Sequence, residues 1–411
     1  MSKREVRHLL VGLDIGTSKV ICVVGEVMPD GQIQVIGEGT APSRGIKKGV
    51  VVNIEATTQS IRRAVENAEQ IAGCRAQAVY VGISGAHIRS SNSTGVVPVR
   101  GREVHDKDVE AVIDSARARA IPADQKILHV VPQEFIVDGQ DGIHEPVGMA
   151  GVRLEAHVHM VTGSLSATQN IHKCVESCGL RVEKLILQHL ASSHAVLLPD
   201  ERDLGVCMVD IGGGTSDIAV FKGGSVRHTA VLPIAGDQVT SDISVMFRTP
   251  VPYAEDLKVK YGCALPELVA DHEMIEVKSV GDMPAHSLSR HTLAEVIKPR
   301  FEEIFRMIRK ELHRHDFYDL ITSGVVLTGG SSQMPGVREL AEAIFERPVR
   351  LGVPHGVQGL KDVVKNPACS TAIGLLIYSL QDQPRLGGHG SEGPGYGHLL
   401  SRISGWFREN F

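Results

Sequence analysis

The chain has few aromatic residues: they make up 4% of its 411 residues, and Trp406 is the only tryptophan. Proteins that bind single-stranded nucleic acids stack bases on aromatic side chains, so this scarcity argues against that class. An excess of positive charge is also missing, because the formal net charge is −5. A general binder of polyanions needs a basic surface, and the sequence therefore predicts no nucleic acid partner.

Long apolar runs are missing too. No stretch of the sequence reaches the length needed to span a bilayer. Lys3, Arg4 and Arg7 precede the apolar segment LLVGL, which resembles the start of a secretory signal peptide. Asp14 interrupts this apolar run after a few residues, and no cleavage site follows, so we expect neither a signal peptide nor a membrane-spanning helix.

A disulfide framework is not indicated, because the seven cysteines are scattered and odd in number. We expect reduced thiols in a cytosolic protein, with Cys174 and Cys178 as neighbours on a helix and not as a zinc knuckle. The histidine pairs His157/His159 and His313/His315 could be metal ligands. We expect strand and surface histidines instead, because we find no partner Cys or Glu at ligand spacing.

Two common nucleotide-binding motifs are absent: the sequence has no G-x-x-x-x-G-K-[ST], and no G-x-G-x-x-G follows its first strand. P-loop and Rossmann folds are therefore excluded. In their place one pattern occurs twice, as GLDIGTSKV (Gly12–Val20) and as VDIGGGTSDIAVF (Val209–Phe221). Each copy reads as an apolar strand, a turn of Gly, Thr and Ser, and a second β-branched strand. Two such hairpins predict two similar half-domains that close on one nucleotide.

The residue types in the two turns suit phosphate. Glycines let the backbone approach an anion, successive N–H groups form an anion-binding concavity, and hydroxyls and a lysine add donors. The expected phosphate-binding residues are Gly16, Thr17, Ser18, Lys19, Gly212, Gly213, Gly214 and Thr215. Asp14 and Asp210 stand at equivalent places at the ends of the two strands. Two carboxylates facing a triphosphate suit Mg²⁺, held in part through water.

Further elements are expected between and after the hairpins. Asn53 can cap a helix that ends at Gly73 and carries Ile61, Val65, Ala68 and Ile71–Ala72 on one face. Residues 84–162 have a different pattern of elements, with three expected strands around a helix from Asp106 to Arg119. This pattern predicts an inserted α+β subdomain. Helical stretches are expected from Pro250 to Val280, and one long helix from Ala294 to His315.

Five segments together resemble the actin/Hsp70/sugar-kinase superfamily. They are, in family order, DIGTSKV, DIGGGTSDIAVF, the connecting helix QHLASSHAVL, the adenosine segment LTGGSSQMPGV and the second connecting helix ACSTAIGLLIYSL. The resemblance implies an α/β, actin-like, two-lobed ATPase fold of the duplicated ribonuclease H-like type, which binds ATP. The implied site residues are Glu255 and Lys258 beside the ribose and adenine, and Gly329, Gly330, Ser331 and Gln333 around the nucleoside.

Gln188 stands where many members of the superfamily place a Glu or Gln that orients the attacking water. Since glutamine is a poor base, slow ATP hydrolysis or none is expected. A polar residue at the start of a helix is the alternative interpretation of Gln188, and a solvated ion pair is the alternative for Glu255 and Lys258.

Within that superfamily the chain is similar to the FtsA family of bacterial cell-division proteins, essentially from end to end. The segments that carry this narrower match are RGIKKGVVVNIE (Arg44–Glu55), His129–Gly163, AEDLKVKYGCA (Ala254–Ala264) and the C-terminal segment. The implied division of the chain is a first lobe core (1–83, completed by 163–203 and 360–383), an FtsA-type inserted subdomain (84–162), a second lobe core (204–226, completed by 302–359), an accessory subdomain (227–301), a flexible linker (384–397) and an amphipathic helix (398–411).

The resemblance also implies partners and a place of action. The expected function is to polymerise as an actin-like filament of the chain itself on anionic lipid, at the cytoplasmic face of the inner membrane and at the division site. There the filament would hold the tubulin-like protein FtsZ, through the accessory subdomain and the helix after it, and help to recruit later division proteins.

The last segment, HLLSRISGWFRENF, is apolar again after a Gly- and Pro-rich tether. As a helix, its apolar residues fall within roughly 140° of the wheel, and Arg402, Arg408 and Glu409 face the other way. Such a helix suits the membrane interface, whereas a terminal helix docked on the body is the alternative. The expected membrane residues are Leu399, Leu400, Ile403, Trp406, Phe407, Arg402 and Arg408.

Two other functions remain open from the sequence. A small-molecule kinase or phosphatase of the same superfamily would need a catalytic carboxylate facing a substrate pocket, and we find no signature of one. An Hsp70-type chaperone would need a β-sandwich after the ATPase, where this chain has a tether and a helix.

Overall fold

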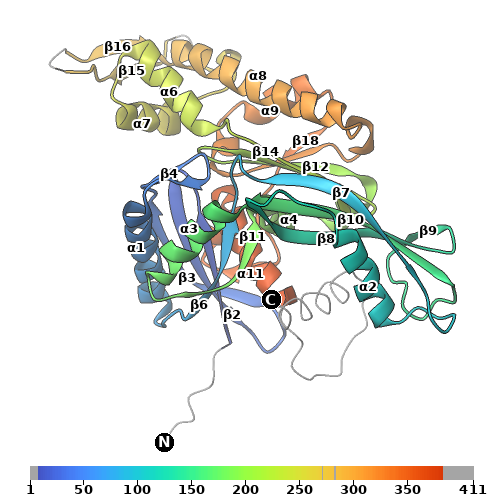
Figure 1. The fold of residues 1–411 in the computed structure, drawn as a ribbon. Helices are drawn as coiled ribbons and strands as arrows, with labels where there is room; N and C mark the ends of the chain where they lie inside the picture. The colour runs from blue at the N-terminus through green and yellow to red at the C-terminus, as the bar shows by residue number, and fades with distance from the viewer. Residues whose placement is uncertain (1–7, 271, 282–283, 383–411) are drawn as a thin grey trace, which may run out of the picture.

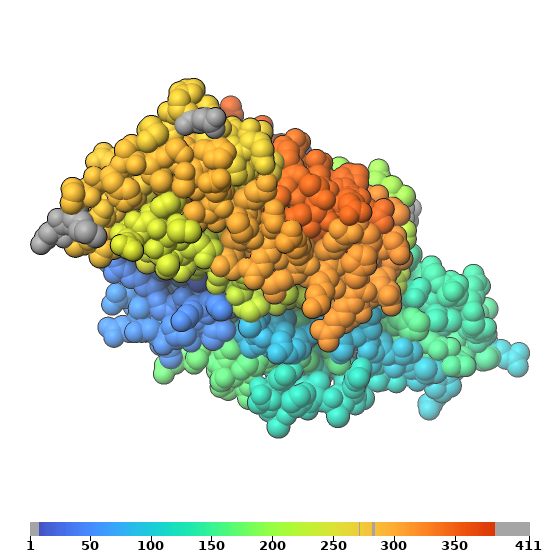
Figure 2. Space-filling view, turned by 90° about the horizontal axis from the view of Figure 1, so that it is seen from above, coloured from blue at the N-terminus to red at the C-terminus, as the bar shows by residue number. Residues whose placement is uncertain are grey.

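The structure, a computed structural model, describes residues 8–270, 272–281 and 284–382. Two lobes lie one above the other, each built on a mixed β-sheet, and a smaller sheet projects to one side of them (Figure 1). Seen from above, the second lobe (yellow to orange) covers the first lobe (blue), and the inserted subdomain (cyan to green) extends beyond it (Figure 2).

The first lobe contains a six-stranded sheet in the order β11-β6-β1-β2-β3-β19. Its strands β1, β2 and β3 form an antiparallel meander, whereas β6 and β11 run parallel to β1. The strands, with the short β4–β5 ribbon nearby, are β1 (Leu9–Ile15), β2 (Lys19–Val27), β3 (Ile33–Pro42), β4 (Ile46–Lys47), β5 (Val50–Val51), β6 (Ala78–Ile83), β11 (Arg181–Leu187) and β19 (Val357–Gly359).

Helices cover both faces of this sheet. Helix α1 packs on β2 and β3 beside α3, and α11 packs on β1 together with α4. The expected capping of α1 is confirmed, since the Asn53 side chain accepts a hydrogen bond from the Ala56 N–H and Gly73 ends the helix with φ 65°. The helices of this lobe are α1 (Ile54–Ala72), α3 (Leu165–Glu176), α4 (Gln188–Val196), α10 (Lys361–Val364) and α11 (Ser370–Asp382). The short helix α5 (Pro199–Leu204) follows α4 and contacts the second lobe.

The inserted segment forms a four-stranded antiparallel sheet in the order β7-β10-β8-β9, with α2 packed on it. This sheet has a core of its own, centred on the fully buried Phe135 and Leu154. Its elements are β7 (Arg89–Pro98), α2 (Asp106–Arg117), β8 (Gln125–Val137), β9 (Gln140–Ile143) and β10 (Arg153–Ser164).

The second lobe contains a five-stranded sheet in the order β14-β13-β12-β17-β18. The strands are β12 (Val206–Ile211), β13 (Ser216–Lys222), β14 (Ser225–Leu232), β17 (Val325–Thr328) and β18 (Val349–Leu351), and a separate ribbon consists of β15 (Met274–Val277) and β16 (His286–Ser289). The helices are α6 (Gly236–Phe247), α7 (Val251–Tyr261), α8 (Arg290–Arg314) and α9 (Val337–Phe345), and the 3₁₀ turns of the chain are η1 (Pro266–Leu268), η2 (Tyr318–Leu320), η3 (Gly330–Gln333) and η4 (Pro367–Cys369).

The duplication predicted from the two hairpins is present in the sheets. In each lobe a three-stranded antiparallel meander is followed by two strands parallel to its first strand. The turn between β1 and β2 and the turn between β12 and β13 therefore occupy equivalent places. The long helix α8 also matches its prediction, with Phe301, Ile304 and Ile308 fully buried.

Three expectations about elements are wrong or incomplete. Ile71 is 58% exposed and does not belong to the buried face of α1, because the face is completed by Ala68 and Ala72. Residues 274–277 are not helical but form β15, which pairs with β16 in a ribbon. The short strand β9 was not predicted, because its sequence, QDGI, contains polar residues and a glycine.

Candidate nucleotide site between the lobes

A cleft of about 530 Å³ lies where the two hairpin turns face each other. Residues that the sequence assigned from five separate segments line this one cleft. They are Asp14, Gly16, Thr17, Ser18, Lys19, Gln188, Asp210, Gly212, Gly213, Gly214, Thr215, Glu255, Lys258, Gly329, Gly330, Ser331 and Gln333. The structure therefore brings together all the residues that were expected to bind the nucleotide and magnesium.

The two turns approach each other closely enough to require glycine. A Cβ atom on Gly214 would lie 2.5 Å from the Thr17 hydroxyl oxygen, and one on Gly213 would lie 2.9 Å from the Ser18 Cβ. The Thr17 hydroxyl in turn accepts a hydrogen bond of 3.0 Å from the Gly49 N–H. Side chains larger than hydrogen at these positions would force the lobes apart, so the glycine run sets the width of the cleft.

Three carboxylates, Asp14, Asp210 and Asp217, line the cleft floor. Asp210 accepts hydrogen bonds from Ser192 (2.5 Å) and Thr371 (3.3 Å), and Asp217 accepts one from Ser84 (2.6 Å). Burial, together with the negative charge of Asp210, raises the pKa of Asp14 and of Asp217 to about 7. Burial also raises the pKa of Asp210, against the effect of its two hydroxyl donors.

This donor set fits a divalent cation. Burial disfavours the ionised form of each carboxyl, and the charge of Asp210 adds to this at Asp14 and Asp217; a cation between them would reverse both effects. Oxygen ligands are those that Mg²⁺ takes, usually few from the protein and the rest from water and phosphate. Asp14 and Asp210 would hold the ion, which would supply charge neutralisation for the phosphates.

Gln188 is both the first residue of α4 and a neighbour of this cluster. Its side-chain amide donates a hydrogen bond of 2.8 Å to the Asp14 carboxylate. The two interpretations of Gln188 are therefore compatible in geometry: it leads a helix and it faces the cleft. Its amide nitrogen also donates to the Ile15 carbonyl (3.4 Å), which leaves its oxygen as the group available to a water molecule.

The opposite wall of the cleft carries the ion pair of Glu255 and Lys258, 2.6 Å apart. Lys258 is 8% exposed and also donates to the Gly236 carbonyl (3.1 Å) and the Thr240 hydroxyl (2.9 Å). It is therefore not a solvated surface residue, although Glu255 is partly exposed. The pair holds the first turn of α6 against α7 and forms part of the cleft wall.

The loop after β17 completes the cleft. Gly329 has φ 87°, and a Cβ there would lie 2.3 Å from an Asp210 carboxylate oxygen. The Ser331 hydroxyl donates to the Gly212 carbonyl (2.8 Å), and Gln333 contacts the Asn366 side chain (3.3 Å). This loop thereby fixes the position of the second hairpin turn relative to the adenosine segment.

The sequence analysis missed three groups that line the cleft: Asp217, the pair Gly236–Asp237, and Asn366. Asp217 lies directly across the hairpin from Asp210, so the strand register of the second motif contained the signal. Gly236 and Asp237 donate backbone hydrogen bonds to the Gly212 and Gly213 carbonyls (3.2 and 2.7 Å), contacts that no local pattern predicts.

Several other expectations can be placed. All seven cysteines are free thiols, as expected. Among the described residues, no helix is both long and apolar enough to cross a bilayer. The expected membrane residues, Leu399 to Phe407 with Arg402 and Arg408, lie outside the described residues, as does the linker before them.

Comparison with known proteins identifies the family. Residues 207–374 match the family model "Cell division protein FtsA", and residues 85–162 match the model "SHS2 domain inserted in FTSA". The chain is 56% identical to cell division protein FtsA of Pseudomonas aeruginosa, 47% identical to that of Neisseria meningitidis serogroup B and 44% identical to that of Escherichia coli K12. Each of these matches covers 100% of both chains.

Solved structures resemble the fold at low sequence identity. A chain of the PilM-PilN type IV pilus biogenesis complex has a TM-score of 0.66 at 18% identity, with 91% of this chain and 99% of that chain covered. The protein MreB5 of Spiroplasma citri, solved bound to ADP, has a TM-score of 0.55 at 13% identity, with 90% and 94% covered. The expected actin-like, two-lobed α/β fold with an inserted α+β subdomain is thus confirmed. Taken with the full-length identities, these findings show that the chain belongs to the FtsA family of proteins and acts in cell division.

Proposed function

We propose that the chain is an ATP- and Mg²⁺-binding scaffold that polymerises at the cytoplasmic face of the inner membrane and tethers FtsZ there, so that later division proteins can assemble. One observation carries the proposal: the residues assigned to a nucleotide from four separate segments all line a single cleft between the lobes. MreB5 of S. citri, which shares the fold, was solved with ADP and with AMPPNP, which supports a nucleotide in the equivalent cleft.

Slow hydrolysis is the part of the proposal that concerns chemistry. The cleft offers two groups near an attacking water, the Gln188 side-chain oxygen and the Asp217 carboxyl. Glutamine orients water but accepts a proton poorly, whereas a carboxyl with a pKa of about 7 is half ionised at neutral pH and can accept one. A bound cation would lower that raised pKa and weaken the base, so turnover is expected to be slow.

The membrane part of the proposal rests on the sequence of residues 398–411. Its aromatic and leucine face with flanking arginines suits anionic lipid, and one short helix binds weakly by itself. Stable attachment therefore needs many copies, which a filament provides.

The surface proposed for FtsZ lies on the accessory subdomain, at the outer face of the second lobe (Figure 2). Helices α6 and α7 and the ribbon β15–β16 expose large apolar side chains there, which is unusual for a surface that contacts only water. These side chains are Val245 (76% exposed), Met246 (64%), Met274 (59%) and Val251 (58%).

Co-sedimentation tests the proposal with three components added separately and together: vesicles with anionic lipid, ATP with Mg²⁺, and FtsZ. We expect the full chain to bring FtsZ down with vesicles when ATP is present. Deletion of residues 398–411 should abolish sedimentation with lipid and leave nucleotide binding intact. A truncated chain that still sediments with vesicles would contradict the anchor, and a full chain that binds no nucleotide would contradict the scaffold.

The docking surface has its own test. The double variant V245E/M246E should lose FtsZ recruitment while it still sediments with vesicles and binds ATP. Ile71→Glu is the matched control, because Ile71 is an apolar side chain that is 58% exposed on the first lobe, outside the accessory subdomain. Equal loss in the control, or none in the double variant, would place the FtsZ contact elsewhere.

A further inference from the structure

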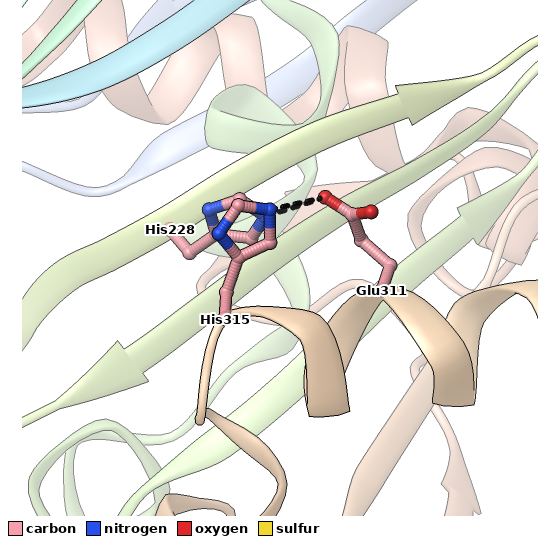
Figure 3. Close-up of side chains that lie close together, drawn as sticks. All are labelled: His228, Glu311 and His315. Carbon is pink, nitrogen blue, oxygen red and sulfur yellow. Dashed lines mark hydrogen bonds and ion pairs between the residues drawn. The ribbon is translucent and has the colours of Figure 1, made fainter.

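Three side chains with metal-ligating atoms converge on the second lobe, and none of them lines the nucleotide cleft. His228 comes from β14, Glu311 from the last turns of α8, and His315 from the residue that ends that helix. The Nε2 atoms of His228 and His315 lie 3.1 and 3.2 Å from the same Glu311 carboxylate oxygen. In Figure 3 the two imidazole rings overlap and both face the carboxylate, and their centroids lie 4.6 Å apart.

We propose that His228, Glu311 and His315 form a binding site for a divalent transition-metal cation of the zinc type. Imidazole and carboxylate are ligands that Zn²⁺ accepts, and two histidines with one glutamate are a known set of three protein ligands. Tetrahedral coordination with bonds of 2.0–2.1 Å separates neighbouring ligand atoms by about 3.3 Å. The two distances to the shared oxygen match that edge, and all three ligand atoms lie within 4.8 Å of one another.

The fold holds these ligands in place without a metal. The His228 ring stacks on Phe317 with 5.1 Å between ring centroids, and the Phe317 N–H donates to the Leu312 carbonyl (2.9 Å), so the chain folds back over the end of α8. The His228 side chain is 11% exposed, whereas that of His315 is 40% exposed. A cation would thus enter from the His315 side and keep its fourth position for water.

The three side chains offer a cation both lone pairs and negative charge. A neutral imidazole offers a lone pair to a cation, and the Glu311 carboxylate supplies negative charge. The sequence analysis had judged His315 to lack a partner Glu, which is wrong: Glu311 stands one helical turn before it, and the fold adds His228.

A metal here would act on the contact between the second lobe and the inserted subdomain. Thr229, the residue after His228 in β14, faces that subdomain: its carbonyl accepts a hydrogen bond from Ser90 (2.7 Å) and its hydroxyl contacts His159 (2.9 Å). A cation bound through His228 would fix β14 to the end of α8 from the opposite face of the strand. The site would therefore stabilise the strand on which the inserted subdomain rests.

Titration of the tag-free full chain with Zn²⁺, in excess Mg²⁺ to occupy oxygen-ligand sites, tests the proposal by calorimetry and by the shift in unfolding temperature. We expect one zinc per chain at this site and a higher unfolding temperature with zinc. His315→Ala and Glu311→Gln should each weaken the binding at least tenfold and remove the thermal shift. Co²⁺ as a second probe should give the visible spectrum of a nitrogen- and oxygen-ligated site, without a thiolate charge-transfer band.

The matched control is His291→Ala. His291 and Glu295 form the same (i, i+4) pair at the start of α8, with 3.9 Å between the nearest atoms, but no third ligand completes a group around them within the described residues. This variant should bind zinc like the parent chain. The proposal is overturned if the parent chain binds no zinc, if His315→Ala retains full affinity while folded by circular dichroism, or if His291→Ala loses affinity equally.

Discussion

At the scale of single residues, the cleft concentrates negative charge where burial makes charge costly. Asp14 and Asp217 each have a pKa of about 7, against an ordinary value of 3.8. A carboxyl whose pKa is raised by folding stabilises the folded chain fully below pH 3.8, and this contribution is lost as the pH rises to about 7. The cleft is therefore expected to lower the stability of the nucleotide-free chain at neutral pH.

Asp217→Asn should relieve part of this cost. The asparagine oxygen can still accept the hydrogen bond from Ser84, and the variant loses the buried charge. At pH 8, without divalent cations, we expect the free energy of unfolding to rise by about 2 kcal/mol, and at pH 4 the gain should disappear. Urea denaturation at the two pH values measures both. Asp141→Asn, at an exposed position of β9, is the control and should change neither value.

Gly329 offers a second test at this scale, with Gly31 as a comparison. Both have positive φ angles, 87° and 82°, but a Cβ meets Asp210 at Gly329 and nothing within 4 Å at Gly31. Gly31→Ala is strained by its positive φ alone, by about 1 kcal/mol. Gly329→Ala combines the clash with a backbone of φ 87° and ψ 167°, a region essentially restricted to glycine, for about 1–3 kcal/mol more. We expect Gly329→Ala alone to lose ATP binding in a fluorescent-nucleotide assay. Equal losses of stability in the two variants would argue against the close approach of Gly329 to the Asp210 carboxylate.

At the scale of elements, polar contacts of β14 hold the inserted subdomain against the second lobe. The Gln133 side chain is 4% exposed and donates to the Val226 carbonyl (2.7 Å), while the Ser225 hydroxyl donates back to the Gln133 carbonyl (2.9 Å). The contact therefore includes buried hydrogen bonds whose loss leaves polar groups unpaired.

Gln133→Ala should weaken the contact between β8 and β14 without unfolding either sheet. The Val226 carbonyl would lose its donor inside the contact, at a cost of about 1–3 kcal/mol. We expect faster amide hydrogen exchange in β8 and β14, with the first-lobe sheet unchanged. Gln140→Ala, at an exposed position of β9, should exchange like the parent chain. Uniformly faster amide exchange throughout the chain would indicate global destabilisation instead of the loss of a local contact.

The elements themselves were largely predictable, because periodicity and caps are local. The two hairpins, the capped helix α1 and the buried stripe of α8 follow from residues close together in the chain. The ribbon β15–β16 was not predicted, because its two strands have only four residues each and are separated by a loop. Such short strands carry too little alternation of apolar and polar residues to be recognised. The cleft residues were predictable where a motif marked them, and Asp237 and Asn366 were not, because only the folded chain brings them there.

At the scale of the whole molecule, the cleft joins the lobes through groups that repel one another when ionised. Asp14 belongs to the first lobe, and Asp210 and Asp217 to the second, and the charge of Asp210 contributes to the raised pKa of both others. Protonation below pH 7 removes this repulsion, and a cation above pH 7 would neutralise it. The distance between the lobes should therefore depend on pH and on Mg²⁺ together.

Small-angle scattering of the chain that lacks residues 398–411, the proposed membrane segment, can measure this opening. At pH 8 without Mg²⁺ and nucleotide, Asp14 and Asp217 are mostly ionised and we expect a larger radius of gyration than at pH 5, where both are protonated. Adding Mg²⁺ and ATP at pH 8 should restore the compact value, and chelation of the metal should reverse it. Asp217→Asn should open less at pH 8, because one of the repelling charges is gone. An identical radius under all conditions would mean that the contacts between the hairpin turns, and not the carboxylates, set the separation of the lobes.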